Sequence, residues 1–317
     1  MNNIRESYFI ELDEDAQRQY IDARAVFTAW EDARRAADEV RGGMYWQTKH
    51  AQDYLIRTSA SNSQKSLGPR SPDNEEIYRR FMERKQLSDK RVADLKKELA
   101  KHQRLNKVHR VGRAPNILVE ILNKLYKSGI AEYFTVVGTH ALYAYEAEAG
   151  LRILGTAALA TRDVDLLWDI QRRLSFVTKM HNLDTSFLSL LKKVDPTFTR
   201  RDDQHHTAYN SKGFEVDLIR RLHKDGDPHP VQITDDEGDF YVVEAESAAS
   251  LQGAAQFQTI IVSTSGQMAR MKTVPPVVFA KTKRWLSELE SREAVKRQRD
   301  KMQAEIVEKL LADHLLP

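Results

Sequence analysis

The first third of the chain places apolar residues at helical spacing on both sides of one polar segment. Residues 14–58 carry an apolar stripe among Ala, Glu and Arg, which predicts a helix with a break at Gly42-Gly43. Residues 58–74 are rich in Ser, Asn, Gly and Pro and predict a loop or linker. A second charged helix is predicted from residue 75 to about residue 106. Its apolar stripe consists of Ile77, Phe81, Leu87, Val92, Leu95 and Leu99.

From residue 107 the pattern changes to short apolar strands that alternate with helices. The predicted strands are residues 131–138, 161–169 and 213–222, and the predicted helices are residues 116–130, 139–150, 170–181 and 185–194. The last third predicts short strands at 240–246 and 259–264, a turn at 265–271, and two helices after Pro275-Pro276. We therefore expect an α+β fold with a helical region over residues 1–106, a core over 107–225 and a C-terminal region over 226–317.

Composition narrows the class of protein. The 317 residues have a formal net charge of only +3, so bulk charge does not argue for nucleic acid. Cysteine is absent, which excludes disulfides, cysteine-ligated zinc and a thiol nucleophile. We see no signal peptide and no apolar stretch near the ~20 residues that span a bilayer. These features predict a soluble, cytoplasmic protein without a membrane partner.

The predicted strand 161–169 carries two carboxylates on one face. Asp163 and Asp165 are two positions apart, so both side chains project from the same side of the strand. Like charges at this spacing repel, and a purely structural strand gains nothing from them. A divalent cation between them changes the balance, because carboxylate oxygens are the ligands that Mg²⁺ and Mn²⁺ prefer. Asp217 lies between apolar residues in a later strand and is the predicted third ligand, with Glu215 as the alternative.

A Gly-Thr turn precedes these strands. Gly138 follows an apolar strand and allows a ligand to approach the backbone closely. The helix predicted to start at Thr139 offers free N–H groups that favour phosphate, and its hydroxyl adds a hydrogen bond. The turn and the carboxylates together predict a site for a phosphate and a metal ion.

These motifs, "VVGTHALYAYEAEA", "TRDVDLLWD" and "FEVDLIRR", resemble those of the nucleotidyltransferase (DNA polymerase β-like) superfamily. Within that superfamily the chain looks like the bacterial minimal nucleotidyltransferase-fold proteins related to abortive-infection toxins, and "FAKTKRWLSELESREAVKRQRDKMQA" resembles their helical segment. The resemblance covers roughly residues 110–305. It implies a small mixed sheet with flanking helices, a toxin or phage-defence role, and catalytic, metal-binding roles for Asp163, Asp165 and Asp217. Gly138 and Thr139 match the family's Gly-Ser turn, although the gap from Gly138 to Asp163 is longer than in the family.

Basic residues near these motifs are candidates for nucleotide binding. The candidates are Arg162, Lys281, Arg284, Lys296 and Arg299. Pairs one helical turn apart can face one phosphate chain, but the same spacing suits ordinary charge pairs on a solvated helix. The basic residues of helix 75–106 leave a similar choice between a solvated face and one that follows a phosphate backbone.

The function that unites these features is a metal-dependent nucleotidyltransferase. We expect it to use Mg²⁺ or Mn²⁺ and to move NMP from a nucleoside triphosphate (NTP) to an acceptor hydroxyl on an RNA or tRNA 3′ end or on a protein side chain. A catalytically silent module of the same fold that binds nucleotide or nucleic acid is the alternative. Residues 1–105 are a candidate arm for a partner protein. His140 and His205-His206 are more simply explained as structural or loop residues.

Overall fold

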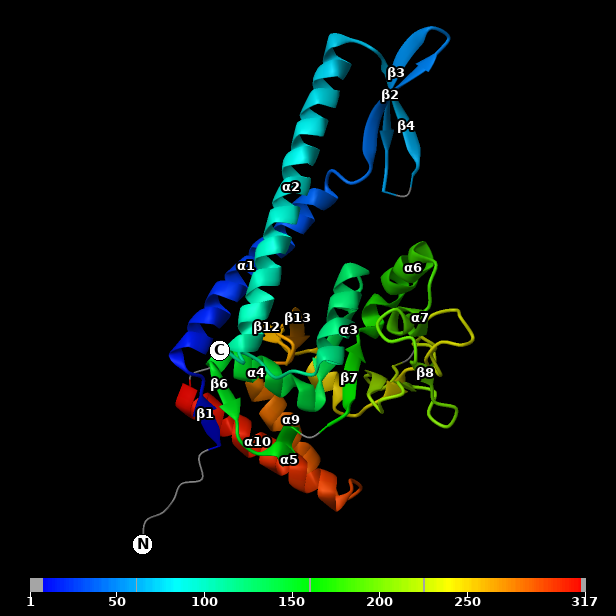
Figure 1. The fold of residues 1–317 in the computed structure, drawn as a ribbon. Coiled ribbons are helices and arrows are strands. Elements are labelled where there is room, and N and C mark those ends of the chain that lie inside the picture. Colours follow the sequence, from blue (N-terminus) through cyan, green and yellow to red (C-terminus); the bar gives the residue numbers. More distant parts are fainter. Residues whose placement is uncertain (1–7, 61, 160, 225, 315–317) are drawn as a thin grey trace. The chain divides into compact units, whose positions relative to one another are not determined.

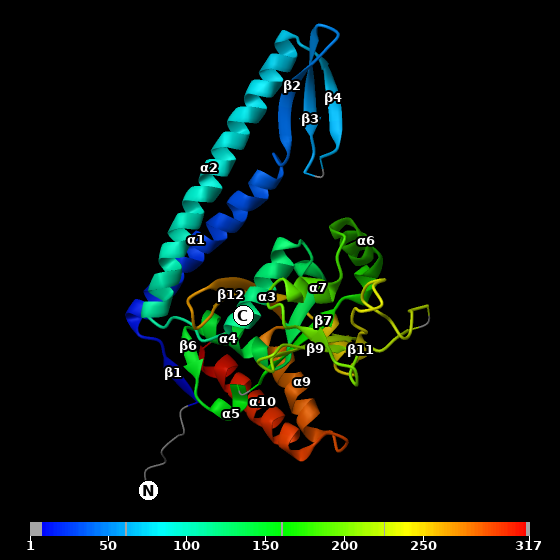
Figure 2. The ribbon, with the colours of Figure 1, turned by 45° about the vertical axis from the view of Figure 1, so that its right-hand side comes forward.

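The computed structural model describes residues 8–60, 62–159, 161–224 and 226–314, and it divides into two compact units (Figures 1 and 2). One unit contains Arg18–His109, and the other contains the described residues up to Gln17 and from Arg110 onward. No helix in the described ranges is long and apolar enough to cross a membrane.

The N-terminal unit contains a three-stranded antiparallel sheet between two helices, where we predicted one long helix and a linker. Helix α1 (Glu14–Asp38) is followed by β2 (Gly43–Lys49), β3 (Gln52–Thr58), β4 (Gln64–Pro69) and α2 (Pro72–Val108). The aromatic and β-branched side chains of residues 43–58 favour a pleated sheet. A two-residue turn at His50-Ala51 joins β2 to β3 with both φ angles positive, 49° and 62°. Helical prediction failed here because this turn lacks the usual Asn-Gly or Asp-Gly signal.

The charged face of α2 is largely neutralised by its own acids. Arg79 lies 2.7 Å from both Glu76 and Glu83, and half of the other lysines and arginines on the helix also have a carboxylate partner within 4.0 Å. These are Arg80, Arg84, Lys85, Lys97 and Lys101. The exposed helix therefore fits the solvated alternative better than a strip of free cations.

The second unit is built on one mixed sheet. Its strand order is β12-β13-β5-β7-β10-β9-β8, and β11 pairs with β10. The strands are β5 (Phe134–Val137), β7 (Asp163–Trp168), β8 (Thr199–Arg200), β9 (Thr207–Tyr209), β10 (Glu215–Arg220), β11 (Val243–Glu244), β12 (Phe257–Val262) and β13 (Met268–Thr273). β13 occupies much of the predicted turn at 265–271, and the strands of the predicted C-terminal region join the sheet of the core. The predicted α+β class is confirmed.

Helices cover this sheet and connect its strands. They are α3 (Asn116–Lys127), α4 (Leu142–Ala149), α5 (Thr156–Leu159), α6 (Arg173–Leu183), α7 (Phe187–Lys192), α8 (Ala248–Gln252), α9 (Pro276–Glu288) and α10 (Ala294–His314). Short 3₁₀ turns are η1 (Ala131–Tyr133), η2 (Gly138–Ala141) and η3 (Ile170–Arg172).

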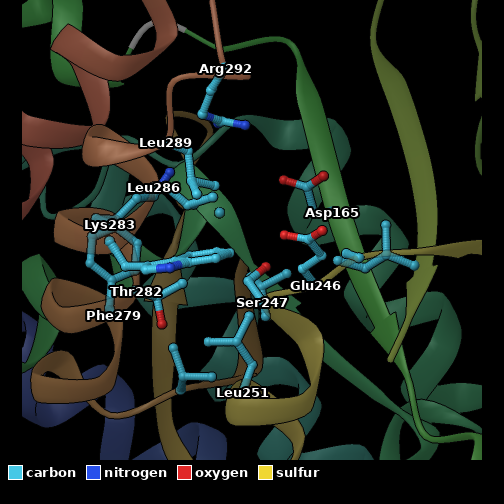
Figure 3. A pocket seen from close by; sticks show the side chains of 16 residues that line it. Asp165, Glu246, Ser247, Leu251, Phe279, Thr282, Lys283, Leu286, Leu289 and Arg292 are labelled. Carbon is cyan, nitrogen blue, oxygen red and sulfur yellow. The ribbon is translucent and has the colours of Figure 1, made fainter. Parts of the chain in front are cut away.

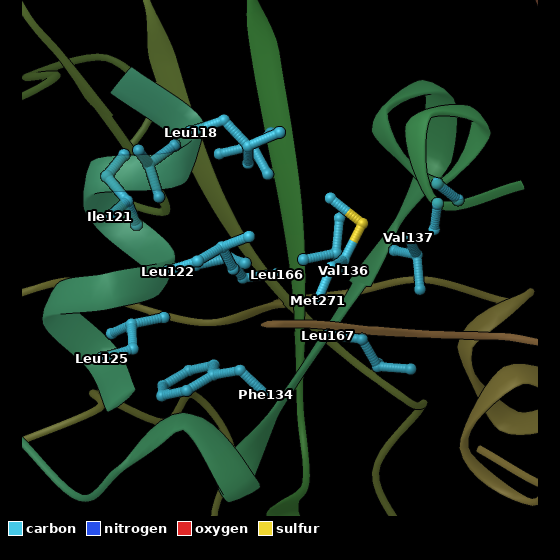
Figure 4. Packing of buried hydrophobic residues seen from close by; sticks show 14 of the residues in the cluster. Leu118, Ile121, Leu122, Leu125, Phe134, Val136, Val137, Leu166, Leu167 and Met271 are labelled. Carbon is cyan, nitrogen blue, oxygen red and sulfur yellow. The ribbon is translucent and has the colours of Figure 1, made fainter. Parts of the chain in front are cut away.

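The sheet face that packs against α3 is apolar, whereas the opposite face carries both the aspartates and apolar side chains such as Leu167. Leu118, Ile121, Leu122 and Leu125 of α3 face the sheet, where they lie near side chains such as Leu166 (Figure 4). In β7 and β10 alternate residues are buried, beginning with Val164 and Val216. The intervening residues, which include the aspartates, must therefore project from the opposite face.

The long segment between Gly138 and Asp163 carries its own structure. It contains α4, the strand β6 (Leu151–Ile153) and α5. β6 pairs antiparallel with β1 (Phe9–Glu11), so the insert ties the start of the described chain to this unit.

Candidate active site

The three predicted aspartates converge on one face of the central sheet. β7 and β10 are parallel neighbours, and their register sets Asp165 opposite Asp217. The carboxylates of Asp163, Asp165 and Asp217 each offer an oxygen within 4.8 Å of the others. Glu215 is paired with Asp163 in the register, but its carboxylate bonds to Arg201. This leaves Asp217 as the third member of the cluster, as the sequence predicted.

Threonine hydroxyls hold two of the three carboxylates. Thr161 donates a hydrogen bond to Asp163, and Thr207 on β9 donates one to Asp217 with an O–O distance of 2.5 Å. These bonds limit side-chain rotation, so the oxygens are oriented before any ligand binds.

Electrostatics make this cluster unfavourable without a cation. Burial, followed by the charges of Asp163 and Asp217, raises the pKa of Asp165 from its ordinary 3.8 to about 7. Burial also raises the pKa of Asp217, although its hydrogen bond from Thr207 opposes the change. Carboxylates this close together resist ionisation unless a positive charge lies beside them. The cluster is therefore suited to a bound cation.

Gly138 lies directly against the cluster. Its φ angle is +69°, and a Cβ atom at this position would come within 2.3 Å of the Asp165 Oδ2 atom. Only glycine avoids both the backbone strain and the collision. Thr139 is buried, and its hydroxyl accepts a hydrogen bond of 3.0 Å from Gln303 of α10. The turn therefore packs closely against the carboxylates, and the Thr139 side chain is held by α10.

A cavity of about 320 Å³ opens beside Gly138 and Asp165 (Figure 3). Two cations line it: Lys283 on α9 and Arg292 in the segment after it. Both are held by Asp300 of α10, a fully buried carboxylate, at 2.8 Å from Lys283 Nζ and 2.6 Å from Arg292 Nε. Burial lowers the pKa of Lys283, and the charge of Asp300 opposes this change. The arrangement can hold an anion between fixed cations and a cluster of carboxylates that could hold a metal ion.

Comparison with known proteins identifies the family. A family model described as nucleotidyltransferase matches residues 116–317, more than half of the chain. This chain is a nucleotidyltransferase. No curated protein and no solved structure matches it. The matched range contains the aspartate cluster, the Gly-Thr turn and the residues that line the cavity.

The predicted nucleotide-binding cations lie outside the lining of this cavity. Lys281 and Arg162 are exposed, and Lys296 pairs with Glu293 at 2.9 Å. The remaining two candidates are Arg284 on α9 and Arg299 on α10. Arg284 is held by Glu305 and Glu308, and Arg299 is partly buried on α10.

Sequence reasoning missed the cations of this nucleotidyltransferase that do line the cavity. The buried positions of α9 are Pro276, Phe279, Ala280 and Lys283, so Lys283 belongs to the helix's inward face. A lysine in phase with an apolar stripe was a usable signal. No local signal marks Arg292, because its position depends on Asp300 eight residues further along the chain.

His140, His223 and His229 lie outside this cluster, whereas the charge of His206 lies close enough to Asp217 to oppose the rise in the pKa of that carboxyl. His140 is 1% exposed between Tyr143 and Phe214, and burial lowers its pKa to about 4. It is therefore a neutral packing residue. His223 and His229 lie near Glu244, but their rings stack nearly parallel and Arg220 already binds that carboxylate at 2.9 Å. Imidazole lone pairs lie in the ring plane, so stacked rings do not converge on one ion.

Proposed function

We propose that this nucleotidyltransferase is metal-dependent and transfers NMP from an NTP to an acceptor hydroxyl, using Asp163, Asp165 and Asp217. The observation that carries the proposal is the convergence of these carboxylates beside a cavity that also contains two oriented cations. A triphosphate needs both kinds of group, because its charge must be balanced at the reacting phosphorus and along the leaving phosphates.

The donor set fits Mg²⁺ or Mn²⁺. The three carboxylates are hard oxygen ligands within 4.8 Å of one another, and burial and mutual repulsion raise the pKa of Asp165 to about 7. When bound, the cation supplies charge neutralisation and polarises the phosphoryl oxygens.

The protein's own residues have separable roles in this proposal. Lys283 and Arg292 bind the phosphate oxygens, and Asp300 keeps both cations turned toward the cavity. Gly138 lets the Asp165 carboxylate lie directly against the turn. Asp217 accepts the proton of the acceptor hydroxyl, and the oxygen of that hydroxyl forms a bond to the α-phosphorus. The bond from the α-phosphorus to the oxygen that bridges to the β-phosphate breaks, and pyrophosphate leaves.

The acceptor is proposed as a hydroxyl of an RNA 3′ end or of a protein side chain. Ion pairing of about half of the basic residues on α2 weakens the preference for RNA. A toxin or phage-defence role is proposed on the motif resemblance alone. It predicts that expression of the active enzyme stops bacterial growth and that expression of an Asp163→Ala/Asp165→Ala variant does not.

The reaction is tested by incubating the full chain with each NTP labelled at the α-phosphate, Mg²⁺ and either total RNA or a total protein extract. We expect label in one acceptor class, and loss of that label in Asp163→Ala/Asp165→Ala. The exposed loop pair Asp235→Ala/Asp236→Ala is the matched control and should retain transfer. Nucleotide binding without transfer to any acceptor would instead favour the catalytically silent module.

A further inference from the structure

The middle of the cavity contains polar side chains that the proposed reaction does not use. Figure 3 shows Arg292 and Asp165 toward one end and Leu251 at the other, with Glu246 and Ser247 between them. Leu286 and Leu289 lie beside Arg292, so apolar side chains line the charged end as well, whereas none of the charged lining residues lies at the Leu251 end.

The polar side chains of this middle section are open to solvent or to a ligand. Within the described residues, the side chains of Glu246, Ser247 and Thr282 have no hydrogen-bonding or ionic partner. Glu246 is exposed in the segment after β11, and Thr282 lies on α9. By contrast, Lys283, which follows Thr282, is bonded to Asp300. The middle section thus offers one carboxylate and two hydroxyls to a ligand.

A free carboxylate is unexpected in a cavity that binds a triphosphate, because the two negative charges repel. Glu246 is also outside the group of carboxylates whose oxygens lie within 4.8 Å of one another. A ligand that donates hydrogen bonds to the Glu246 carboxylate would be attracted to it instead. An ionised carboxylate can accept hydrogen bonds but cannot donate them, so the matching ligand group must carry O–H or N–H.

The order of groups along the cavity identifies that part of the ligand. Phosphates against Lys283 and Arg292, and a base against Leu251 at the other end, put the sugar between them at Glu246. Acidic side chains bind the ribose 2′-hydroxyl in other nucleotide sites for the same chemical reason. We propose that Glu246 binds the ribose hydroxyls and makes the site selective for ribonucleoside over 2′-deoxyribonucleoside triphosphates. This inference rests on the proposed function of the cavity.

The test compares the dissociation constants of the four NTPs and their 2′-deoxy analogues, measured by calorimetry with Mg²⁺ on the full chain. For at least one base, we expect the wild-type protein to bind the ribonucleotide about tenfold more tightly, the size expected for one hydrogen bond to a charged group. In Glu246→Ala the ratio should fall to near one. The deoxynucleotide should bind that variant no more weakly than it binds the wild type, because the repulsive charge is gone.

Glu237→Ala, which removes an exposed carboxylate outside the cavity lining, should keep the wild-type ratio. Equal binding of NTP and dNTP by the wild type, or an unchanged ratio in Glu246→Ala, overturns the role of Glu246 while leaving the nucleotide site intact. Failure of the wild type to bind any nucleotide contradicts the proposed function itself, and the inference with it.

Discussion

Replacing Asp165 by Asn should stabilise the metal-free protein at neutral pH while it abolishes transfer. Burial and the neighbouring aspartates raise the pKa of the Asp165 carboxyl, so folding favours its protonated form. A raised carboxyl pKa makes the folded state more stable below the unfolded pKa, and this stability is lost as pH rises toward the folded pKa. The loss of stability therefore develops between pH 3.8 and about pH 7 and stays constant at higher pH. Asn cannot ionise and avoids it.

The magnitude follows from the same change in pKa. A rise from 3.8 to about 7 corresponds to at most about 4 kcal/mol, because each pKa unit is worth about 1.4 kcal/mol. Asp165 is partly exposed, so solvent screening reduces this value, and we expect about 1–2 kcal/mol.

Urea denaturation in EDTA at a series of pH values measures the effect. Asp165→Asn should exceed the wild type in free energy of unfolding at pH 8 and lose that advantage toward pH 4. Adding Mg²⁺ should stabilise the wild type more than the variant. Asp235→Asn, an exposed aspartate outside the cavity lining, should match the wild type throughout. If Asp165→Asn is less stable than the wild type at pH 8 in EDTA, or if the difference does not vary with pH, the electrostatic reasoning is wrong.

Three other predictions concern the groups around the cluster. Gly138→Ala should lower the free energy of unfolding by at least about 1 kcal/mol and abolish transfer, because φ is +69° and the new methyl group meets Asp165 Oδ2. Thermal melting and label transfer measure these effects, and a fully active variant contradicts the prediction. Asp300→Ala should lower the free energy of unfolding in urea by about 3–5 kcal/mol, because Lys283 and Arg292 lose their buried counterion. A decrease below about 1 kcal/mol would show that these two ion pairs do not stabilise the fold. Lys283→Met should lower kcat/KM for the NTP by about 100-fold, the effect of losing one charged group at a transferring phosphoryl group, while Lys281→Met leaves steady-state kinetics unchanged.

The aspartate cluster could be predicted because its signal is local. Period-two alternation assigned Asp163 and Asp165 to one face of a strand, and the same texture marked Asp217. Only the parallel pairing of β7 with β10 brings Asp217 opposite Asp165, and that pairing joins residues about fifty positions apart.

The cations and the N-terminal sheet depended on longer-range information. Charge spacing alone could not distinguish Lys281 from Lys283, because the inward face of α9 is defined by what packs against it. The sheet at β2–β4 was missed because the turn at His50-Ala51 carries no residue that favours positive φ. The insert before Asp163 became interpretable only when β6 was found paired with β1.

The central claim is tested most directly by following two labels through one reaction. The enzyme is given Mg²⁺, acceptor and an NTP labelled at either the α- or the γ-phosphate, and acceptor and released phosphates are separated. Nucleotidyl transfer at the cluster of Asp163, Asp165 and Asp217 predicts α-label in the acceptor and γ-label in pyrophosphate, with both lost in Asp217→Asn. Appearance of γ-label in the acceptor, or undiminished transfer by Asp217→Asn, would contradict it.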